Sequence, residues 1–140
     1  MGIIYPTTTF SVVIDRGGVD PDISFEISSY RINFSNTTTG GGGFDVEAGD
    51  LFVQKELDIA SIPLFEAVTE GIFFQTLTLT VTQDAITLLT IILEDVSVTG
   101  FDQTGSGDGV SEEVRFHYEV ITMETDAFGL NQSDTFDRNA

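Results

Sequence analysis

The side chains able to perform acid–base or metal chemistry in this sequence are mostly carboxylates, together with one histidine, His117, and no cysteine. A single histidine cannot supply a two-histidine metal site or a histidine proton relay within one chain. The sequence contains no Gly-x-Ser-x-Gly elbow, and no pair of strand carboxylates stands out as a general acid and base. We therefore expect no enzymatic activity and no cofactor.

Calcium binding is a second chemistry to consider, because oxygen-bearing side chains occupy every second position from Asp102 to Asp108. This spacing is similar to the start of a hand-type calcium loop, but the closing bidentate Glu is missing and only two carboxylates are available. We expect no bound metal, with Asp102 and Asp108 as the candidate ligands if one binds. A monomeric calcium-dependent binding module is therefore an alternative function.

The charge balance restricts the partners of the chain, since 23 acidic residues face only 5 basic ones and the formal charge is -18. Phosphate backbones and anionic lipids would repel such a protein, so we expect neither nucleic acid nor a membrane as a partner. The same charge opposes self-association. An oligomer must therefore bury apolar or backbone surface, or bind cations, to offset the repulsion.

Length and composition predict one folded domain, residues 1–140. Hydrophobic residues make up 41% of the chain, and 12 of them are Phe, which is enough for a core. No stretch approaches the roughly 18 apolar residues of a membrane span, and Met1 to Phe10 lacks the pattern of a secretory signal. We expect a protein that is cytoplasmic before export, or secreted without a signal peptide.

The elements that must position these side chains are mainly β-strands. From Phe73 to Val81 apolar residues alternate with threonines, which predicts a half-buried strand. Phe10–Asp15 and Asp50–Leu57 are also predicted to be strands. In the second of these, Lys55 shares a side with Leu51, Val53 and Leu57.

Two longer predicted strands change the phase of their apolar pattern. The change occurs at Ser28 and Ser29 within Ile23–Phe34, and at Glu94 and Asp95 within Leu88–Thr99. A one-residue shift moves the apolar set to the other face, and a β-bulge can absorb it while bending the strand. We therefore predict a mainly β fold, a small β-barrel or a tight sandwich, with one short α-helix.

The last long strand is predicted over Glu113–Thr125. One face is apolar, and the other mixes Arg115 and His117 with Ile121 and Met123. A face that combines charge with large apolar side chains suits an interface with another copy better than a core.

The helix is predicted to span Ser61–Glu70. Asp58 or Ser61 can cap its start, Pro63 fits the first turn, and Gly71 can end it.

The remaining segments are predicted to be loops. Residues 35–49 contain a threonine run and four consecutive glycines, which predicts a flexible loop followed by an adhesive segment. Gln103–Gly109 is a second glycine-rich loop, and residues 127–140 are predicted to be an irregular tail. Neither glycine-rich stretch has the Gly-Lys-Ser/Thr ending of a phosphate loop.

The segment Phe52–Gly71 resembles the strand-to-helix junction of the haemolysin-coregulated tube proteins of bacterial type VI secretion systems. Leu93–Val98 and Glu113–Thr122 resemble the strand after the helix and the last long strand of that family, so the resemblance covers about Phe10 to Asp126. The matching residues of the junction are Lys55, Asp58, Ser61, Pro63, Leu64, Ala67 and Gly71.

The resemblance implies a structural protein whose six copies close a ring, with the rings stacked into a hollow tube. It further implies export by a contractile machine, a spike protein at one end of the tube and effector cargo in the channel. The long loop would reach a neighbouring subunit. The expected interface residues are Thr37, Thr38, Thr39, Gly40, Gly41, Gly42, Gly43, Phe44, Asp45 and Val46, together with Arg115 and His117.

The acidity of the chain leaves a related alternative open. A tubular filament that works outside the cell, without a sheath or a spike, would also suit an acidic surface rich in Thr and Gly. An acid hydrolase would need a pair of carboxylates in a cleft, and the sequence gives no means of locating one.

Overall fold

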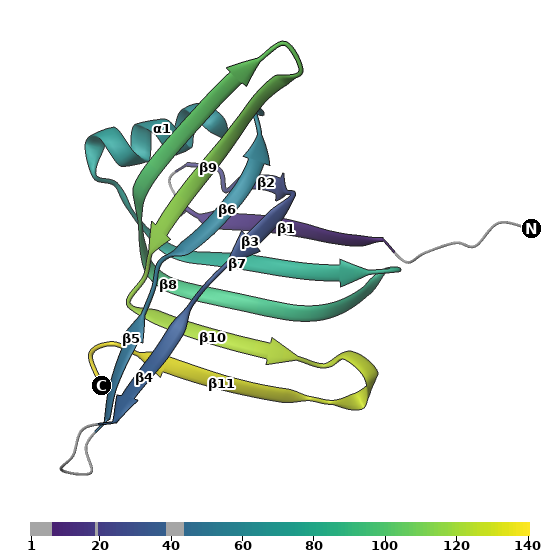
Figure 1. Cartoon of the computed structure of the whole chain (residues 1–140), viewed down its shortest axis with the longest axis vertical. Helices are drawn as coiled ribbons and strands as arrows, with labels where there is room; N and C mark the ends of the chain where they lie inside the picture. The colour runs from purple at the N-terminus through teal and green to yellow at the C-terminus, as the bar shows by residue number, and fades with distance from the viewer. Residues whose placement is uncertain (1–6, 19, 39–43) are drawn as a thin grey trace, which may run out of the picture.

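The structure, a computed structural model, describes residues 7–18, 20–38 and 44–140. This part of the chain is mainly β-strand, with one α-helix and one short 3-10 helix (Figure 1). No helix in these ranges is long and apolar enough to cross a bilayer. In chain order the elements are β1 Thr8–Asp15, β2 Ile23–Ile27, β3 Ser29–Arg31, β4 Phe34–Thr38, β5 Phe44–Ala48, β6 Leu51–Glu56, α1 Ser61–Glu70, β7 Phe73–Gln83, β8 Ile86–Ser106, β9 Gly109–His117, β10 Val120–Thr125, η1 Ala127–Gly129 and β11 Gln132–Asp137.

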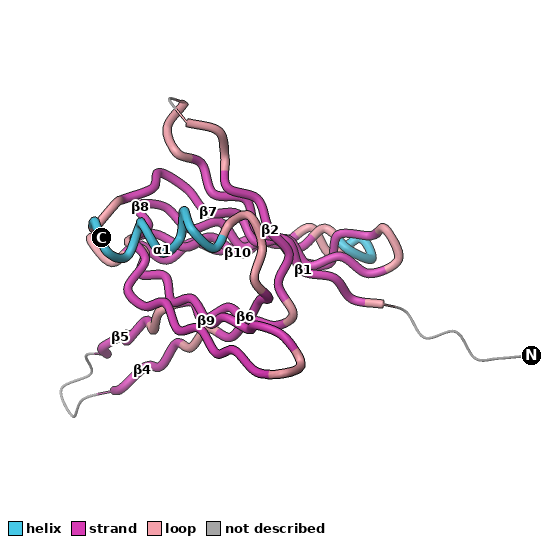
Figure 2. The backbone as a smooth tube through the Cα atoms, turned by 90° about the horizontal axis from the view of Figure 1, so that it is seen from above, coloured by secondary structure: helices cyan, strands magenta, loops and turns pink. Residues whose placement is uncertain are grey.

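Antiparallel pairing joins most strands into one curled sheet. Its order is β2-β1-β7-β8-β9-β6-β3, with β10 also beside β8 and β11 beside β10, while β4 and β5 pair separately. The ends of the main path, β2 and β3, are consecutive in the chain but do not pair, so the sheet is not closed. Figure 2 shows β7, β8 and β10 in one layer and β6 and β9 in the other. The predicted fold class is confirmed, in the form of a tight sandwich.

The long strand β8 connects the two layers. Its first part pairs with β7 and β10, and its second part pairs with β9. Asp95 adopts a φ of 54° at the predicted change of phase, and the register with β9 shifts between Val98 and Gly100. These irregularities bend the strand, so the predicted phase change within Leu88–Thr99 is confirmed.

The core lies between the layers and is built from the alternating apolar positions of each strand. Fully buried side chains come from both layers, and Leu64 and Ala67 of α1 join them. Each large apolar side chain contributes roughly 1.5–3 kcal/mol when it is fully removed from water. The completely buried strand residues include Val12, Ile14, Leu51, Val53, Leu77, Leu79, Ile91, Leu93, Val114 and Phe116.

Helix α1 has the predicted bounds and the predicted end. Gly71 takes a left-handed φ of 65°, which glycine adopts without a Cβ clash. The predicted cap is wrong, because Ala60 occupies the N-cap position and no side chain caps the helix. Asp58 and Ser61 instead stabilise the preceding turn, with Asp58 Oδ1 accepting from Ala60 N at 2.9 Å and Ser61 Oγ accepting from Asp58 N at 3.0 Å.

Two strands predicted as continuous are interrupted. Ile23–Phe34 divides at Ser28, whose N–H donates to Gln54 O at 2.8 Å, and the chain passes from one end of the ladder to the other. Glu113–Thr125 divides at Tyr118 and Glu119, between β9 and β10. Ile23–Phe34 was predicted to have a bulge, and Glu113–Thr125 was predicted to be one straight strand. In both segments the chain instead changes the strand with which it pairs, which sequence periodicity does not encode.

These interruptions change the side of several side chains. Ile121 is buried and Met123 packs against the core, so the mixed face predicted for the last strand continues only through Arg115 and His117. A separate reversal occurs at the start of β7, where Phe74 is buried and Phe73 is 73% exposed, the opposite of the predicted pattern.

Three segments predicted as loops or tail contain ordered strands, and one of them, Gln103–Gly109, lies largely within β8. The arms of the 35–49 loop form the β4–β5 hairpin, and residues 39–43, which include Thr39 and Gly40 to Gly43, lie outside the described residues. The tail 127–140 contains η1 and β11, and β11 pairs with β10 along its whole length. Backbone pairing explains these corrections, because it does not require an apolar sequence pattern.

Candidate functional site

A buried polar cluster joins β6, the start of α1, β8 and β9. Lys55 Nζ lies 2.7 Å from Glu112 Oε1 and 2.8 Å from Asp58 Oδ1, and it donates to Glu56 O at 2.9 Å. Ser61 Oγ lies 3.2 Å from Lys55 Nζ and donates to Glu112 Oε1 at 2.8 Å. The side chains of Lys55 and Glu112 are completely buried, whereas Asp58 lies at the edge of the cluster and is partly exposed.

The electrostatics of the cluster favour the charged form of Glu112. Burial by itself raises the pKa of Glu112, because a buried carboxylate loses hydration. Hydrogen bonds from Lys55, Gln103 and Ser61, with the charge of Lys55, outweigh burial and hold the pKa of Glu112 below its usual range. The amide of Gln103 donates to the second carboxylate oxygen at 2.8 Å. A fully hydrogen-bonded, solvent-excluded ion pair is suited to fixing structure.

The residues of the strand-to-helix junction thus have two structural roles. Lys55, Asp58 and Ser61 form the polar cluster, whereas Leu64 and Ala67 are completely buried in the core. Pro63 lies in the first turn of α1, and Gly71 ends it. The junction therefore fixes how α1 packs beside the sheet.

The β4–β5 hairpin is fixed firmly at its base. Gly49 N donates to Asn33 O at 2.8 Å, and Tyr118 Oη donates to Gly49 O at 2.7 Å. Arg138 donates from Nη2 to Ala48 O at 3.0 Å, which ties the C-terminal segment to the same point. The hairpin is therefore held by both the β9–β10 junction and the end of the chain.

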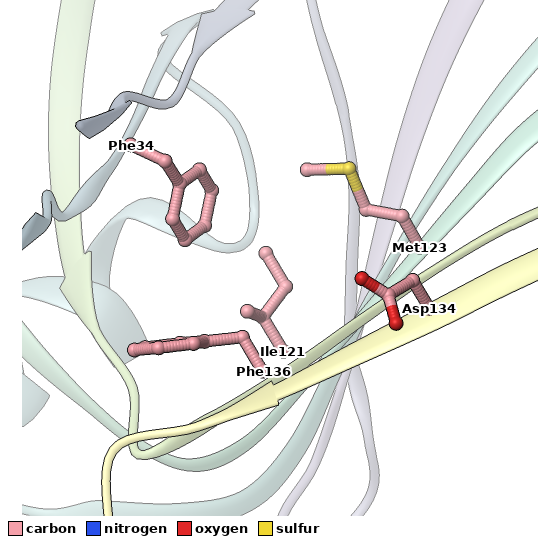
Figure 3. Close-up of a pocket in the computed structure, with 5 residues that line it drawn as sticks. All are labelled: Phe34, Ile121, Met123, Asp134 and Phe136. Atoms are coloured by element: carbon pink, nitrogen blue, oxygen red, sulfur yellow. The ribbon is translucent and has the colours of Figure 1, made fainter. Parts of the chain in front are cut away.

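An apolar hollow of about 190 Å³ lies beside this base. Figure 3 shows Phe34 facing Phe136 and Ile121, with Met123 and Asp134 on the far side of the hollow. The rings of Phe34 and Phe136 meet edge to face with centroids 6.1 Å apart. This contact joins the base of the hairpin to the β10–β11 layer.

Beyond its base the hairpin extends away from the main sheet (Figure 1). Its two strands pair only with each other. A two-stranded ribbon is at best marginally stable in water by itself. The structure thus presents Thr37, Asp45 and Val46 of the predicted interface on an extended arm.

Arg115 and His117, predicted as interface residues, lie on the outer face of β9. His117 stands between two carboxylates, with Nδ1 3.4 Å from Asp50 Oδ1 and Nε2 3.4 Å from Glu119 Oε1. The inward side chains of the same strand, Val114 and Phe116, are completely buried. The two predicted residues therefore share a face that the core does not use.

Large apolar side chains are exposed around the start of α1. Ile59 is 90% exposed and Ile62 is 69% exposed. Ile62 lines a hollow of about 170 Å³ together with Phe73 and Arg16. Neighbouring exposed apolar side chains of this kind are typical of a surface that another protein covers.

Comparison with known proteins establishes the family. The family described as "Type VI secretion system effector, Hcp" matches residues 22–125. The chain belongs to the Hcp family. The match spans most of the chain and confirms the resemblance, and with it the assignment to a type VI secretion protein of the tube class. No curated protein matches the chain.

Solved Hcp structures share this fold at low sequence identity. Hcp1 from Salmonella typhimurium is 19% identical with a TM-score of 0.77, over 94% of this chain and 96% of that one. Hcp1 from the E. coli pathovar EAEC 042 is 19% identical with a TM-score of 0.79, over 93% and 99%. A type VI secretion system effector from Yersinia pestis is 21% identical with a TM-score of 0.72, over 91% and 98%. These identities establish the Hcp fold alone.

The calcium loop considered from the sequence is not a loop in this Hcp protein. Asp102 lies within β8 opposite Glu113, and Asp108 lies in the tight turn to β9, where its N–H donates to Ser106 Oγ at 3.2 Å. In the described ranges no three His, Asp or Glu side chains gather in a group that could hold a metal ion. Strand pairing separates the two candidate ligands, so the hand-type interpretation is wrong.

Sequence reasoning missed Glu112, although a signal for it was present. Glu112 shares its strand parity with Val114, Phe116 and Tyr118, just as Lys55 shares its parity with Leu51 and Val53. Two opposite charges on two inward faces predict a buried ion pair. The position of Phe52 opposite Arg115 on the outer face could not be predicted from the sequence in this way, because it depends on which strands are neighbours.

Proposed function

We propose that this Hcp-family chain is the structural subunit of a hollow tube, in which six copies close each ring and the rings stack. The observation that carries the proposal is the β4–β5 hairpin, a ribbon fixed at its base and extended away from the sheet of its own copy. A ribbon of this kind gains stability by lying on a neighbour. The exposed apolar side chains at the start of α1 supply a second contact surface.

The decisive experiment is to determine the assembly state of the purified protein. Light scattering after gel filtration, with electron microscopy of the same fractions, should show rings. Raising the salt concentration should favour longer stacks, because it screens the repulsion between copies of charge -18. Monomers at every protein and salt concentration tested would overturn the proposal.

The role of the hairpin can be tested by shortening it. A variant lacking residues 40–46 should keep the circular dichroism spectrum and melting temperature of the wild type, because the hairpin lies outside the main sheet. Its rings should stack into shorter tubes. Tubes of unchanged length would refute this role of the hairpin.

Export, cargo and spike binding belong to the same proposal. The tube would leave the cell through a contractile sheath, carry effectors in its channel and meet a spike protein at one end. Removing the sheath from the producing cell should abolish release of the protein. Filaments that still appear outside such cells would instead identify the free extracellular form.

A further inference from the structure

The five basic side chains of this acidic chain differ in whether they have hydrogen-bond or ion-pair partners. Lys55 belongs to the buried polar cluster, and Arg138 donates hydrogen bonds to backbone carbonyl oxygens. Among the described residues, no carboxylate lies within 4.0 Å of Arg16, Arg31 or Arg115. This is unexpected, because the chain contains 23 acidic residues.

Two of these arginines lie in one row across the outer face of the β3, β6, β9 and β8 strands. The register places Phe52 between Arg31 and Arg115, and Arg115 beside Gly100. The guanidinium carbon of Arg31 lies 4.0 Å from the centroid of the Phe52 ring, within cation–π range. We call Arg31, Phe52, Arg115 and Gly100 the arginine row.

Arg115 lies flat against the sheet with an unmet hydrogen-bonding demand. A Cβ at Gly100 would collide with the guanidinium group of Arg115, so glycine allows this position. The Nε–H of Arg115 is buried and has no acceptor in the described part of the chain. A buried N–H without an acceptor costs about 1–3 kcal/mol. The terminal amino groups of the same guanidinium are not buried and make no hydrogen bond in the described part of the chain, so they can donate to an acceptor from outside the copy.

Two carboxylates on the outer face near the row are already engaged. Glu113, on the same face two residues from Arg115, accepts a hydrogen bond from Gln54. Asp50 accepts one from Thr99 Oγ1 at 2.7 Å. Asp102, two residues from Gly100 in β8, is exposed, and no ion pair joins it to Arg115 in the described part of the chain. Arg31 and Arg115 are therefore left without a carboxylate partner in their own copy.

The β4–β5 hairpin carries complementary groups. Asp45 pairs with Thr37 and Glu47 with Ser35, so these four side chains share one face, and both carboxylate residues are exposed. The carboxylate residues are about 6.7 Å apart along β5, and Arg31 and Arg115 are about 9.6 Å apart across β6. The exposed side chain of Arg31 can shift to accommodate this difference. The hairpin contains no Lys or Arg that could neutralise Asp45 and Glu47.

We propose that the arginine row is the docking site for the β4–β5 hairpin of a second copy, with Asp45 and Glu47 accepting hydrogen bonds from Arg31 and Arg115. Within one copy the hairpin extends away from β6 and β9 (Figure 1), so a second copy has to supply it. Charge-assisted pairs of this kind are stronger than neutral hydrogen bonds and orient the partner. The pairing also places opposite charges together where two copies of charge -18 approach.

This inference rests on the proposed function, and its test uses two reciprocal charge reversals. The first variant carries Arg31→Glu and Arg115→Glu, and the second carries Asp45→Arg and Glu47→Arg. Each alone sets like charges against each other, so the protein concentration needed for assembly should rise at least about tenfold. A 1:1 mixture should assemble near the wild-type concentration, because each hairpin then finds a row of opposite charge.

The outcomes separate the two proposals. A wild type that forms no rings or tubes refutes the proposed function. A wild type that assembles, with both variants assembling equally well, refutes only the docking site, as does a mixture that remains dispersed. Loss of binding to an acidic effector peptide by the first variant, with assembly intact, would assign the row to cargo and overturn the proposal.

A matched control carries Asp108→Arg and Glu124→Arg, which change the net charge as much as the hairpin variant does. Both residues are exposed and lie away from the hairpin and the row. This control should assemble at least as well as the wild type. Recovery of assembly in the mixture also shows that both reversed variants are folded.

Discussion

Lys55 Nζ and Glu112 Oε1 lie 2.7 Å apart although 57 residues separate them in the sequence, and neither side chain is exposed. Two charges removed from water are stable only if each satisfies the other and the remaining hydrogen bonds are filled. Ser61, Gln103 and the carbonyl oxygen of Glu56 complete this requirement. The pair therefore couples the packing of α1, β6 and β9, so that displacing one of these elements breaks its polar contacts with the other two.

Replacing only one partner should be severely destabilising. Lys55→Met leaves Glu112 buried without its cation, and we expect the free energy of unfolding to fall by about 3–5 kcal/mol. Urea denaturation of the variant measures this loss. The double variant Lys55→Met with Glu112→Leu should recover much of it, because no charge is then buried. A double variant as unstable as the sum of the two single ones would contradict the pairing.

The lowered pKa of Glu112 predicts a loss of stability in acid. The folded protein holds the carboxylate charged below the usual carboxyl pKa of about 4.3, so its contribution is complete above that pH and is lost as the pH falls through the folded pKa. The melting temperature of the wild type should fall more steeply below pH 4.3 than that of Glu112→Gln. Parallel curves for the two proteins through this range would count against the assignment.

Tyr118 predicts a corresponding loss in alkali. Burial raises the pKa of Tyr118 to about 12, against a smaller lowering by the charge of Arg138. An unfolded tyrosine titrates near 10, so this contribution is complete below about pH 10 and is lost as the pH rises towards the folded pKa. Tyr118→Phe should remove this pH dependence.

Tyr118→Phe should also reduce stability at neutral pH by about 1 kcal/mol, because the hydrogen bond to Gly49 O is lost. The comparison is Tyr30→Phe, since burial raises the pKa of Tyr30 as well. Melting temperatures of the wild type, Tyr118→Phe and Tyr30→Phe measured at alkaline pH show how much of the lost stability comes from each tyrosine. If Tyr118→Phe loses stability above pH 10 as steeply as the wild type does, the buried phenol is not the cause.

Gly100 and Arg115 are expected to be coupled. Gly100→Ala places a methyl group where the Arg115 guanidinium lies and should cost about 1–3 kcal/mol through overpacking. The same substitution in an Arg115→Ala background should cost much less, because the space is then free. Gly107→Ala is the matched control, since a Cβ there meets nothing within 4 Å. An equal cost of Gly100→Ala in both backgrounds would show that the collision is not its origin.

Local patterns determined much of the fold. Helix α1 was predictable because Pro63, the apolar pair Leu64 and Ala67, and Gly71 act within a few residues of one another. The phase change at Asp95 was predictable for the same reason, since a one-residue shift is visible in the alternation itself. The arms of the 35–49 loop were not predictable as strands, because their polar residues are held by backbone pairing alone.

The sequence by itself determined the mainly β class, the single helix and the family to which the chain belongs, because periodicity and motif spacing are local properties. Only the tertiary structure decided that the chain changes its partner strand at Ser28 and at Tyr118. It also decided which outward side chains lie next to each other on neighbouring strands. Ser28 joins opposite ends of the ladder, and Phe52 stands between Arg31 and Arg115, because strand order brings distant segments together. The physical reason is that alternation defines the face on which a side chain lies, whereas its neighbour on that face depends on the register of another strand.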